Sequence, residues 1–208
     1  MTTIFNKLLN DKSFIINLEG YTERYESTCK ELTKGGFKNI IKLNGINGNK
    51  INLHELFSKI NDKYKFEYWD KAFHTMKSKQ GSALSHISVW LYMIKHDIQV
   101  ANIFEDDIVI TDKWDLANIY YESTPKDYDM LFFGSKVYHR PVNFVSVTPC
   151  YCVHAYRITL KGAKFLLNLF SETGFCTLDS KIFHLMFEII FKKDYDTFKW
   201  YVWNTNDY

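Results

Sequence analysis

The chain has 208 residues, with 26 Lys and Arg against 24 Asp and Glu, and its formal net charge of +2 is spread along the sequence. This length suffices for one domain with a sizeable core, and the dispersed charge excludes the concentrated basic stripe typical of nucleic-acid-binding proteins. The four cysteines lack Cys-x-x-Cys spacing and are too few for a disulfide scaffold, so we expect buried free thiols and a reducing compartment. They are Cys29, Cys150, Cys152 and Cys176.

The N-terminus, MTTIFNKLLNDKSF, is too polar for the apolar core of a signal peptide, and the longest apolar runs are shorter than a membrane span. We therefore expect a cytoplasmic protein without a transmembrane segment, for which only peripheral membrane association is open. The chain is rich in Asn, Lys, Ile, Phe and Tyr together, as an A/T-rich microbial or viral genome would encode. This bias explains the 17% aromatic content as well as sugar binding would.

The first part of the chain predicts strands alternating with a helix. SFIINL (13–18) is a short apolar run with high strand propensity, and FKNIIKLNG (37–45) is a second one that closes on Asn-Gly. Between them, residues 21–34 favour a helix that ends at Gly35-Gly36.

The middle of the chain continues this alternation. In GSALSHISVWLYMIKH (81–96), apolar residues recur at helical spacing and predict a helix with one wide buried face. QVANIF (99–104) predicts a strand, residues 113–122 a helix, and YDMLFFG (128–134) another strand. Further along, we expect a strand at 150–159 and helices at 161–170 and 178–191. The order of elements predicts an α/β fold in which helices flank a mostly parallel central sheet.

Three consecutive acidic residues, Glu105, Asp106 and Asp107, follow the strand predicted at 99–104. Ligands of open α/β sheets bind beyond the carboxyl ends of the strands, and alternation along a strand would place Glu105 and Asp107 on one face. Paired carboxylates are hard ligands for Mg²⁺ or Mn²⁺, usually completed by substrate phosphates. The alternative is that these acids cap the next helix or turn, although Asp112 is better placed for that role.

The segments around these acids resemble glycosyltransferase family 25, the lipopolysaccharide-biosynthesis and collagen-galactosyltransferase type. FIINLEGYTERYE is similar to the family's opening strand and Arg-containing segment. GSALSHISVW resembles its G-C-A-L-S-H helix, and IFEDDIVI its E-D-D segment. HAYRITLKGAKFLL resembles a downstream A-Y-x-I-S-x-x-G-A motif, in which we expect Gly162 to allow close helix–sheet packing. TLDSKI stands where the family usually carries Pro-x-Asp.

The resemblance implies a GT-A-type nucleotide-binding sandwich that forms a single glycosyltransferase domain over residues 1–208. Its nucleotide-sugar-binding half would span about 13–110 and its acceptor-side half about 111–208. The implied reaction is metal-dependent, inverting transfer of a hexose, with galactose the first guess, from a UDP-sugar to a hydroxyl of a glycan, glycolipid or protein.

By the same resemblance, Glu105 and Asp107 would hold Mn²⁺ or Mg²⁺ against the diphosphate, and the ion would neutralise the charge that develops on the leaving group. Asp106 would hydrogen-bond the ribose. Asn17 would bond the base or ribose. Arg24 would approach a phosphate, with an ion pair to a neighbouring glutamate as the alternative.

Glu19 stands where the family more often has Asp, and we also place it on the donor side. His86, in the ALSH segment, is a further donor-side candidate, although a lone helical histidine more often has a packing or hydrogen-bonding role. Asp179 is our candidate for the general base that deprotonates the acceptor hydroxyl. Its alternative role is to cap the helix that follows it.

Two departures from the family pattern bear on these roles. The family helix usually begins with Gly-Glu-x-Gly-Cys, whereas this chain has SKQGS (78–82), so one acidic contact is missing. Residues beyond Ile190 have no counterpart to the family's proline-containing C-terminal segment. Two other functions stay open: a catalytically inactive nucleotide-sugar- or glycan-binding module, and a metal-dependent phosphohydrolase. A phosphohydrolase of this kind would require a nucleophilic Asp at the end of the first strand, where this chain has Asn17.

Overall fold

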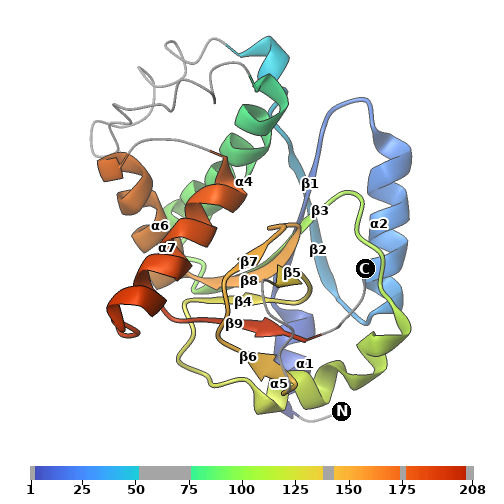
Figure 1. The fold of residues 1–208 in the computed structure, drawn as a ribbon. Helices are drawn as coiled ribbons and strands as arrows, with labels where there is room; N and C mark the ends of the chain where they lie inside the picture. Colours follow the sequence, from blue (N-terminus) through green and yellow to red (C-terminus); the bar gives the residue numbers. More distant parts are fainter. Residues whose placement is uncertain (1–2, 52–75, 138–142, 174–176, 205–208) are drawn as a thin grey trace.

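The structure is a computed structural model that describes residues 3–51, 76–137, 143–173 and 177–204. Its centre is a seven-stranded sheet with helices on both faces (Figure 1). The strands of this sheet are β1 (Lys12–Asn17), β2 (Asn39–Asn44), β3 (Val100–Glu105), β4 (Met130–Phe132), β6 (Val145–Ser146), β8 (Ala155–Thr159) and β9 (Trp200–Trp203). A separate two-stranded sheet pairs β5 (Lys136–Val137) with β7 (Cys150–Tyr151).

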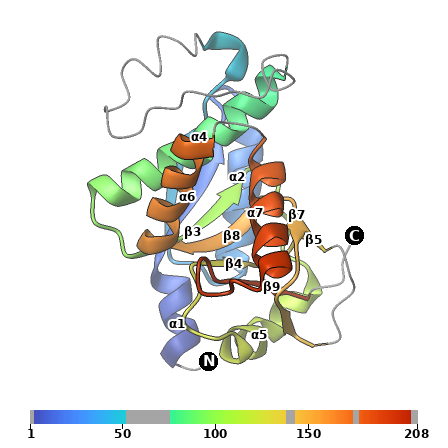
Figure 2. The same cartoon turned by 60° about the vertical axis from the view of Figure 1, so that its left-hand side comes forward.

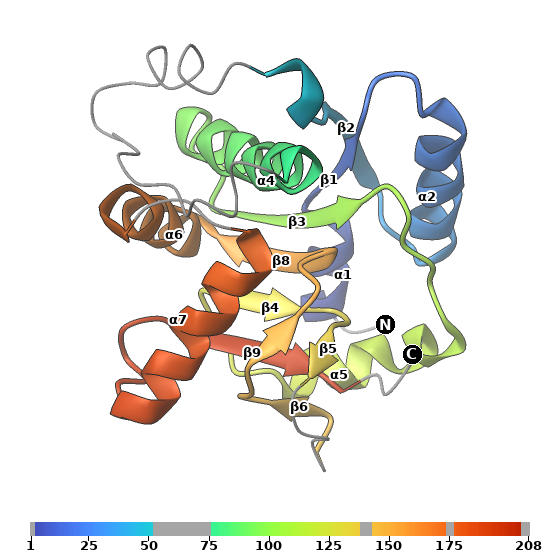
Figure 3. The ribbon, with the colours of Figure 1, turned by 45° about the horizontal axis from the view of Figure 1, so that its top comes forward.

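The strand order in the large sheet is β2-β1-β3-β8-β4-β9-β6 (Figure 3). β1 pairs in parallel with both β2 and β3, and β4 pairs in parallel with β9. β8 is antiparallel to its neighbours β3 and β4, and β6 is antiparallel to β9. The sheet is therefore mixed, with most strands running in one direction, and the predicted α/β sandwich is confirmed.

Two helical layers cover the sheet. The helices are α1 (Thr3–Asn10), α2 (Thr22–Lys34), α4 (Lys77–Lys95), α5 (Ala117–Ser123), α6 (Leu160–Thr173) and α7 (Leu178–Lys192), with 3-10 turns η1 (Gly48–Lys50) and η3 (Asp112–Leu116). Side chains alternate between the two faces of the sheet along β1. Phe14 and Ile16 therefore pack in the core beneath α4, α6 and α7, and Ile15 packs in the core on the other face, beneath α1, α2 and α5. Within the described ranges, no helix is long and apolar enough to span a membrane.

Most predicted elements are confirmed to within a few residues. The strand predicted at 150–159 is wrong as one element: β7 ends at Tyr151, Cys152 takes a positive φ of 72°, and β8 starts only at Ala155. Helix α1 and strands β5, β6 and β9 were not predicted, because each is too short to show a clear periodicity. Cys29, Cys150 and Cys152 are free thiols, but only Cys150 is buried as expected, whereas Cys29 and Cys152 are partly exposed. Cys176 lies outside the described residues.

Gly162 has the packing role that its motif predicted. A Cβ atom at this position would lie 2.5 Å from the backbone oxygen of Asp129, so only glycine lets the start of α6 approach β4 this closely. Nearby, the buried guanidinium of Arg157 on β8 donates to Tyr128 Oη at 2.8 Å, to Asn102 Oδ1 at 2.8 Å and to the Asp11 carboxylate. These bonds tie the start of β1 to β3 and β8.

Candidate active site

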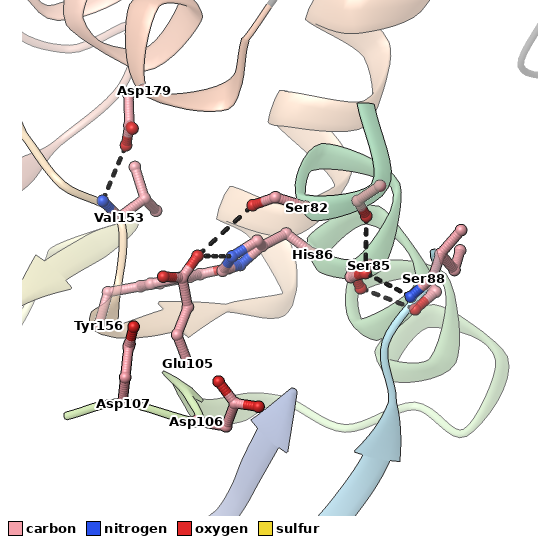
Figure 4. Close-up of polar contacts among 12 residues, drawn as sticks. Ser82, Ser85, His86, Ser88, Glu105, Asp106, Asp107, Val153, Tyr156 and Asp179 are labelled. Atoms are coloured by element: carbon pink, nitrogen blue, oxygen red, sulfur yellow. Dashed lines mark hydrogen bonds and ion pairs between the residues drawn. The ribbon is translucent and has the colours of Figure 1, made fainter. Parts of the chain in front are cut away.

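The three acidic residues lie at the carboxyl end of β3, beside the end of β1 (Figure 4). Strand β3 ends at Glu105, so Asp106 and Asp107 belong to the turn that follows it. The side chain of Glu105 is 37% exposed, that of Asp106 is 11% exposed and that of Asp107 is 59% exposed. This is the sheet edge at which parallel α/β folds bind ligands.

Arg24 of α2 contacts both aspartates. Its guanidinium lies 2.6 Å from Asp106 Oδ1 and 2.8 Å from Asp107 Oδ2. Asn17, at the end of β1, donates its side-chain N–H groups to Asp106 Oδ2 at 2.6 Å and to the backbone oxygen of Tyr21 at 2.9 Å. The sequence alternative, an ion pair of Arg24 with a neighbouring glutamate, is therefore not what the structure shows: Arg24 pairs with Asp106 and Asp107.

Glu105 is held from the other side by His86 of α4. His86 Nε2 lies 3.3 Å from Glu105 Oε1, and its Nδ1 lies 2.9 Å from the Tyr156 hydroxyl, which also accepts the Trp90 indole N–H at 3.1 Å. The two ring nitrogens of His86 thus link the Glu105 carboxylate to the Tyr156 hydroxyl, and the tautomer sets which atom donates at Nδ1. His86 is 1% exposed and lies behind Glu105, so the structure gives it a direct contact with an acid of the site.

The surroundings of Glu105 favour its charged form. Burial by itself raises the pKa of this carboxyl, but the hydrogen bond from His86, the electrostatic attraction of His86 and His154, and the Ser82 hydroxyl at 3.4 Å outweigh it. The pKa of Glu105 therefore lies below its ordinary value. Glu105 enters any reaction as a carboxylate, which is the form that binds cations.

Glu105 lines two cavities formed by the described residues, and the first of them, the α2–α4 cavity, has a volume of about 360 Å³. Glu105 and Asp106 form part of its wall, together with Arg24. The remaining lining is Ile16, Leu18, Tyr21, Gly45, Ile46, Asn47, Gly48, Asn49, Ser78, Ser82 and Ser85. Its size and its mixture of apolar and convergent polar groups are typical of a small-molecule site.

The backbone itself shapes the wall of this cavity. A Cβ atom on Gly48 of η1 would lie 1.6 Å from the backbone oxygen of Lys77, and one on Gly81 of α4 would lie 2.3 Å from that of Ile46. Glycine at both positions lets the 45–49 segment lie directly on the first turns of α4. The Ile46 N–H donates to Ser85 Oγ at 2.8 Å and holds the segment there.

The N-terminal end of α4 reaches both cavities at the acids. Its first turn carries Lys77 and Lys79, contains no acidic residue and has no side-chain cap hydrogen bond. The N-terminus of a helix attracts anions through its N–H groups and its dipole, and the two lysines add to this attraction. This end of α4 is therefore suited to a phosphate group.

The second polar cavity, the α4–α7 cavity, has a volume of about 440 Å³ and lies on the other side of Glu105. Glu105 and Asp107 both line it, although Asp107 lies in the turn beyond β3 rather than on the strand, and their joint role as metal ligands stays a prediction. Asp179 lines it as well, with Lys79, Ser82, Cys152, Val153, His154, Thr177 and Leu178. Residues far apart in the sequence thus face one space (Figure 4).

Asp179 does not cap a helix. Thr177 occupies the N-cap position of α7, and Asp179 is the second residue of the helix, where its Oδ1 accepts the Val153 N–H at 2.9 Å. This bond crosses from α7 to the turn before β8 and fixes the orientation of the carboxylate.

Some site residues were missed from the sequence, and one candidate lies apart. Glu19 is exposed and is absent from the lining of both polar cavities. Ser82, which contacts Glu105, Tyr156, which contacts His86, and Trp90, which donates to the Tyr156 hydroxyl, were not assigned to the site from the sequence. The only sequence signal for Ser82 was its place four residues before His86, on the same helix face.

Comparisons with known proteins identify the family of this chain. The model of "Glycosyltransferase family 25 (LPS biosynthesis protein)" matches residues 10–145, a range that contains the acid cluster. Procollagen galactosyltransferase 1-A of Xenopus laevis is 29% identical over 179 residues, and procollagen galactosyltransferase 1-B of the same species is 28% identical. Both alignments cover 78% of this chain, and the chain spans 29% of the length of each relative. Since the family model matches more than half of the sequence, the chain belongs to glycosyltransferase family 25.

Proposed function

We propose that this chain transfers a hexose from a UDP-sugar to a hydroxyl group of a glycan or protein, with a divalent cation and with inversion at the anomeric carbon. The observation that carries the proposal is the position of Glu105, which lines both the α2–α4 and the α4–α7 cavity beside the positive end of α4. Galactose is the first donor sugar to test, because both relatives are named galactosyltransferases.

The α2–α4 cavity is the proposed donor site. Tyr21, Ile16 and Leu18 supply an apolar wall for the base, and Asp106 supplies an acceptor for ribose hydroxyls. The diphosphate then lies toward the N-terminal end of α4, within reach of Arg24. Arg24 is 47% exposed and pairs with two carboxylates, so a surface side chain of this kind can turn to a phosphate at small cost.

Glu105 and Asp107 fit a divalent cation that binds together with the nucleotide. Among the described residues, no group of three His, Cys, Asp or Glu side chains is arranged to hold a metal ion. Mg²⁺ and Mn²⁺ commonly use one or two carboxylates and take their other ligands from phosphates and water. The two carboxylates on the α4–α7 cavity match that requirement, and the ion would neutralise the negative charge of the departing UDP.

Asp179 is the proposed general base. It lies on the wall of the α4–α7 cavity contributed by α7, whereas Glu105 and Asp107 form the wall at the end of β3. Inversion requires the acceptor hydroxyl to approach from the face opposite the leaving group, so a base on a separate wall from the diphosphate is required. The Val153 N–H at Oδ1 keeps the carboxylate in one orientation.

The first experiment is a panel of nucleotide sugars scored by nucleotide release in the presence of Mn²⁺, together with calorimetric titration of UDP with and without Mn²⁺. We expect UDP-galactose to be the preferred donor and UDP binding to strengthen with Mn²⁺, since nucleotide and ion share ligands. UDP binding without turnover of any donor would identify a binding module instead. Hydrolysis of simple phosphate esters would identify a phosphohydrolase, although Asn17 lacks the nucleophilic carboxylate of that class.

A further inference from the structure

An exposed row of aromatic side chains runs along α7 from the α4–α7 cavity. We call Tyr151, Phe183, Phe187 and Phe191 the aromatic stripe. Tyr151, Phe187 and Phe191 are 37%, 53% and 81% exposed, and Phe183 is half-buried between the first two. The rings of Tyr151 and Phe183 stack at 4.1 Å between centroids, and those of Phe183 and Phe187 lie nearly parallel at 6.4 Å.

The aromatic stripe begins at the candidate active site. Tyr151 directly precedes Cys152 and Val153, which line the α4–α7 cavity. On α7, Asp179 also lines that cavity, and Phe183, Phe187 and Phe191 follow it at successive intervals of four residues, so that each lies beside the one before it on the helix surface. Figure 2 shows α7 on the outside of the molecule with β7 next to it. From Asp179 to Phe191 the helix rises about 18 Å, which is far longer than one monosaccharide.

The chemistry of the stripe favours a carbohydrate partner. Flat aromatic faces bind the C–H faces of pyranose rings, and nearby polar side chains bind the hydroxyl groups. His184, Glu188 and Lys192 are exposed and stand beside the rings on α7. Charged residues are depleted at the core of protein–protein interfaces. A membrane-binding helix would be rich in Lys and Arg, whereas α7 carries Asp179 and Glu188 as well as Lys181 and Lys192.

We propose that the aromatic stripe is an acceptor subsite that binds an extended oligosaccharide and leads its end into the α4–α7 cavity. This inference rests on the proposed function, because it takes the cavity beside Asp179 as the acceptor side. It adds the class of acceptor: a glycan of several sugar units, held by stacking outside the cavity and presented at one hydroxyl inside it.

The test measures glycan binding without requiring catalysis. The purified chain is applied to an array of linear neutral oligosaccharides of glucose, galactose and mannose, from disaccharide to hexasaccharide. We expect binding to grow with length. For the hexasaccharide bound best, Phe187→Ser should raise the dissociation constant about tenfold, the effect of losing one stacked aromatic contact. Phe144→Ser is the control, since Phe144 is 49% exposed but packs against Tyr120, away from α7.

Several outcomes would overturn the inference. These are no glycan binding by the unmodified chain, equal affinities of the chain and Phe187→Ser, and a dimer or a phosphatidylserine vesicle complex that Phe187→Ser abolishes. Calorimetric titration of UDP with Mn²⁺ on the same preparations separates this failure from that of the proposed function. Retained UDP binding with no glycan binding rejects the stripe alone, whereas glycan binding with no UDP binding rejects the donor site alone.

Discussion

Replacing Gly81 by alanine perturbs the contact between α4 and the 45–49 segment without removing any polar group of the site. A Cβ atom there would lie 2.3 Å from Ile46 O and 2.6 Å from Gly48 N, against 3.4–4 Å for ordinary van der Waals contact. Both neighbours are backbone atoms, which cannot rotate away. The segment must therefore move off α4 by about 1 Å.

The expected cost follows from two opposing effects. Overpacking a tight contact costs about 1–3 kcal/mol, and a clash against backbone lies at the upper end of that range. Alanine in place of glycine within a helix returns about 1 kcal/mol. The net destabilisation is therefore about 2 kcal/mol, which lowers the Tm of a domain of this size by about 4–8 °C.

The assay is thermal unfolding combined with UDP titration in Mn²⁺. Because Asn47, Gly48 and Asn49 line the α2–α4 cavity, their displacement should also weaken UDP binding. Lys79→Ala, an exposed change one half-turn away, is the stability control. A Gly81→Ala variant that unfolds at the unmodified Tm and binds UDP equally well would refute the close backbone contact and the placing of the nucleotide.

Three further predictions concern the carboxylates. Asp107→Ala should reduce transfer by at least about 100-fold and change the Tm by less than about 2 °C, since its exposed ion pair with Arg24 contributes little to stability; near-normal turnover would remove Asp107 as a metal ligand. Asp179→Asn should lower kcat much more than UDP affinity, because the amide cannot accept the proton; an effect on UDP affinity alone would remove it as the base. Glu105→Gln should be less stable than the unmodified chain at neutral pH, because the pKa of Glu105 is lowered in the folded state. The difference in unfolding free energy should shrink as the pH falls below the pKa of an unfolded Glu, about 4.3, and then through the lower pKa of Glu105 in the folded chain. Urea unfolding from pH 7 to pH 3 measures it, and a difference independent of pH would contradict the hydrogen bonding by His86.

The sequence predicted the order of strands and helices well, because each long element shows its own periodicity. It placed three acids at the end of a strand in an α/β sheet, and the structure puts them at the predicted edge, beside β1. Gly162 was correctly assigned to close packing, because a glycine at the start of an amphipathic helix has few other roles. The short strands could not be predicted, since β9 is recognisable only through its pairing with β4 and β6.

The contacts within the site depended on the tertiary structure. Periodicity shows which face of an element is buried but not which residue lies opposite, so the pairing of Arg24 with Asp106 and Asp107 across about 80 residues had no local signal. The same holds for Asp179, which meets the acids in one cavity only because α7 and the end of β3 converge there. The sequence by itself determined the α/β order, the acid cluster and the family resemblance. Which charged side chains face one another was decided only by the packing of distant segments, because the whole fold sets the distances between side chains that are far apart in the sequence.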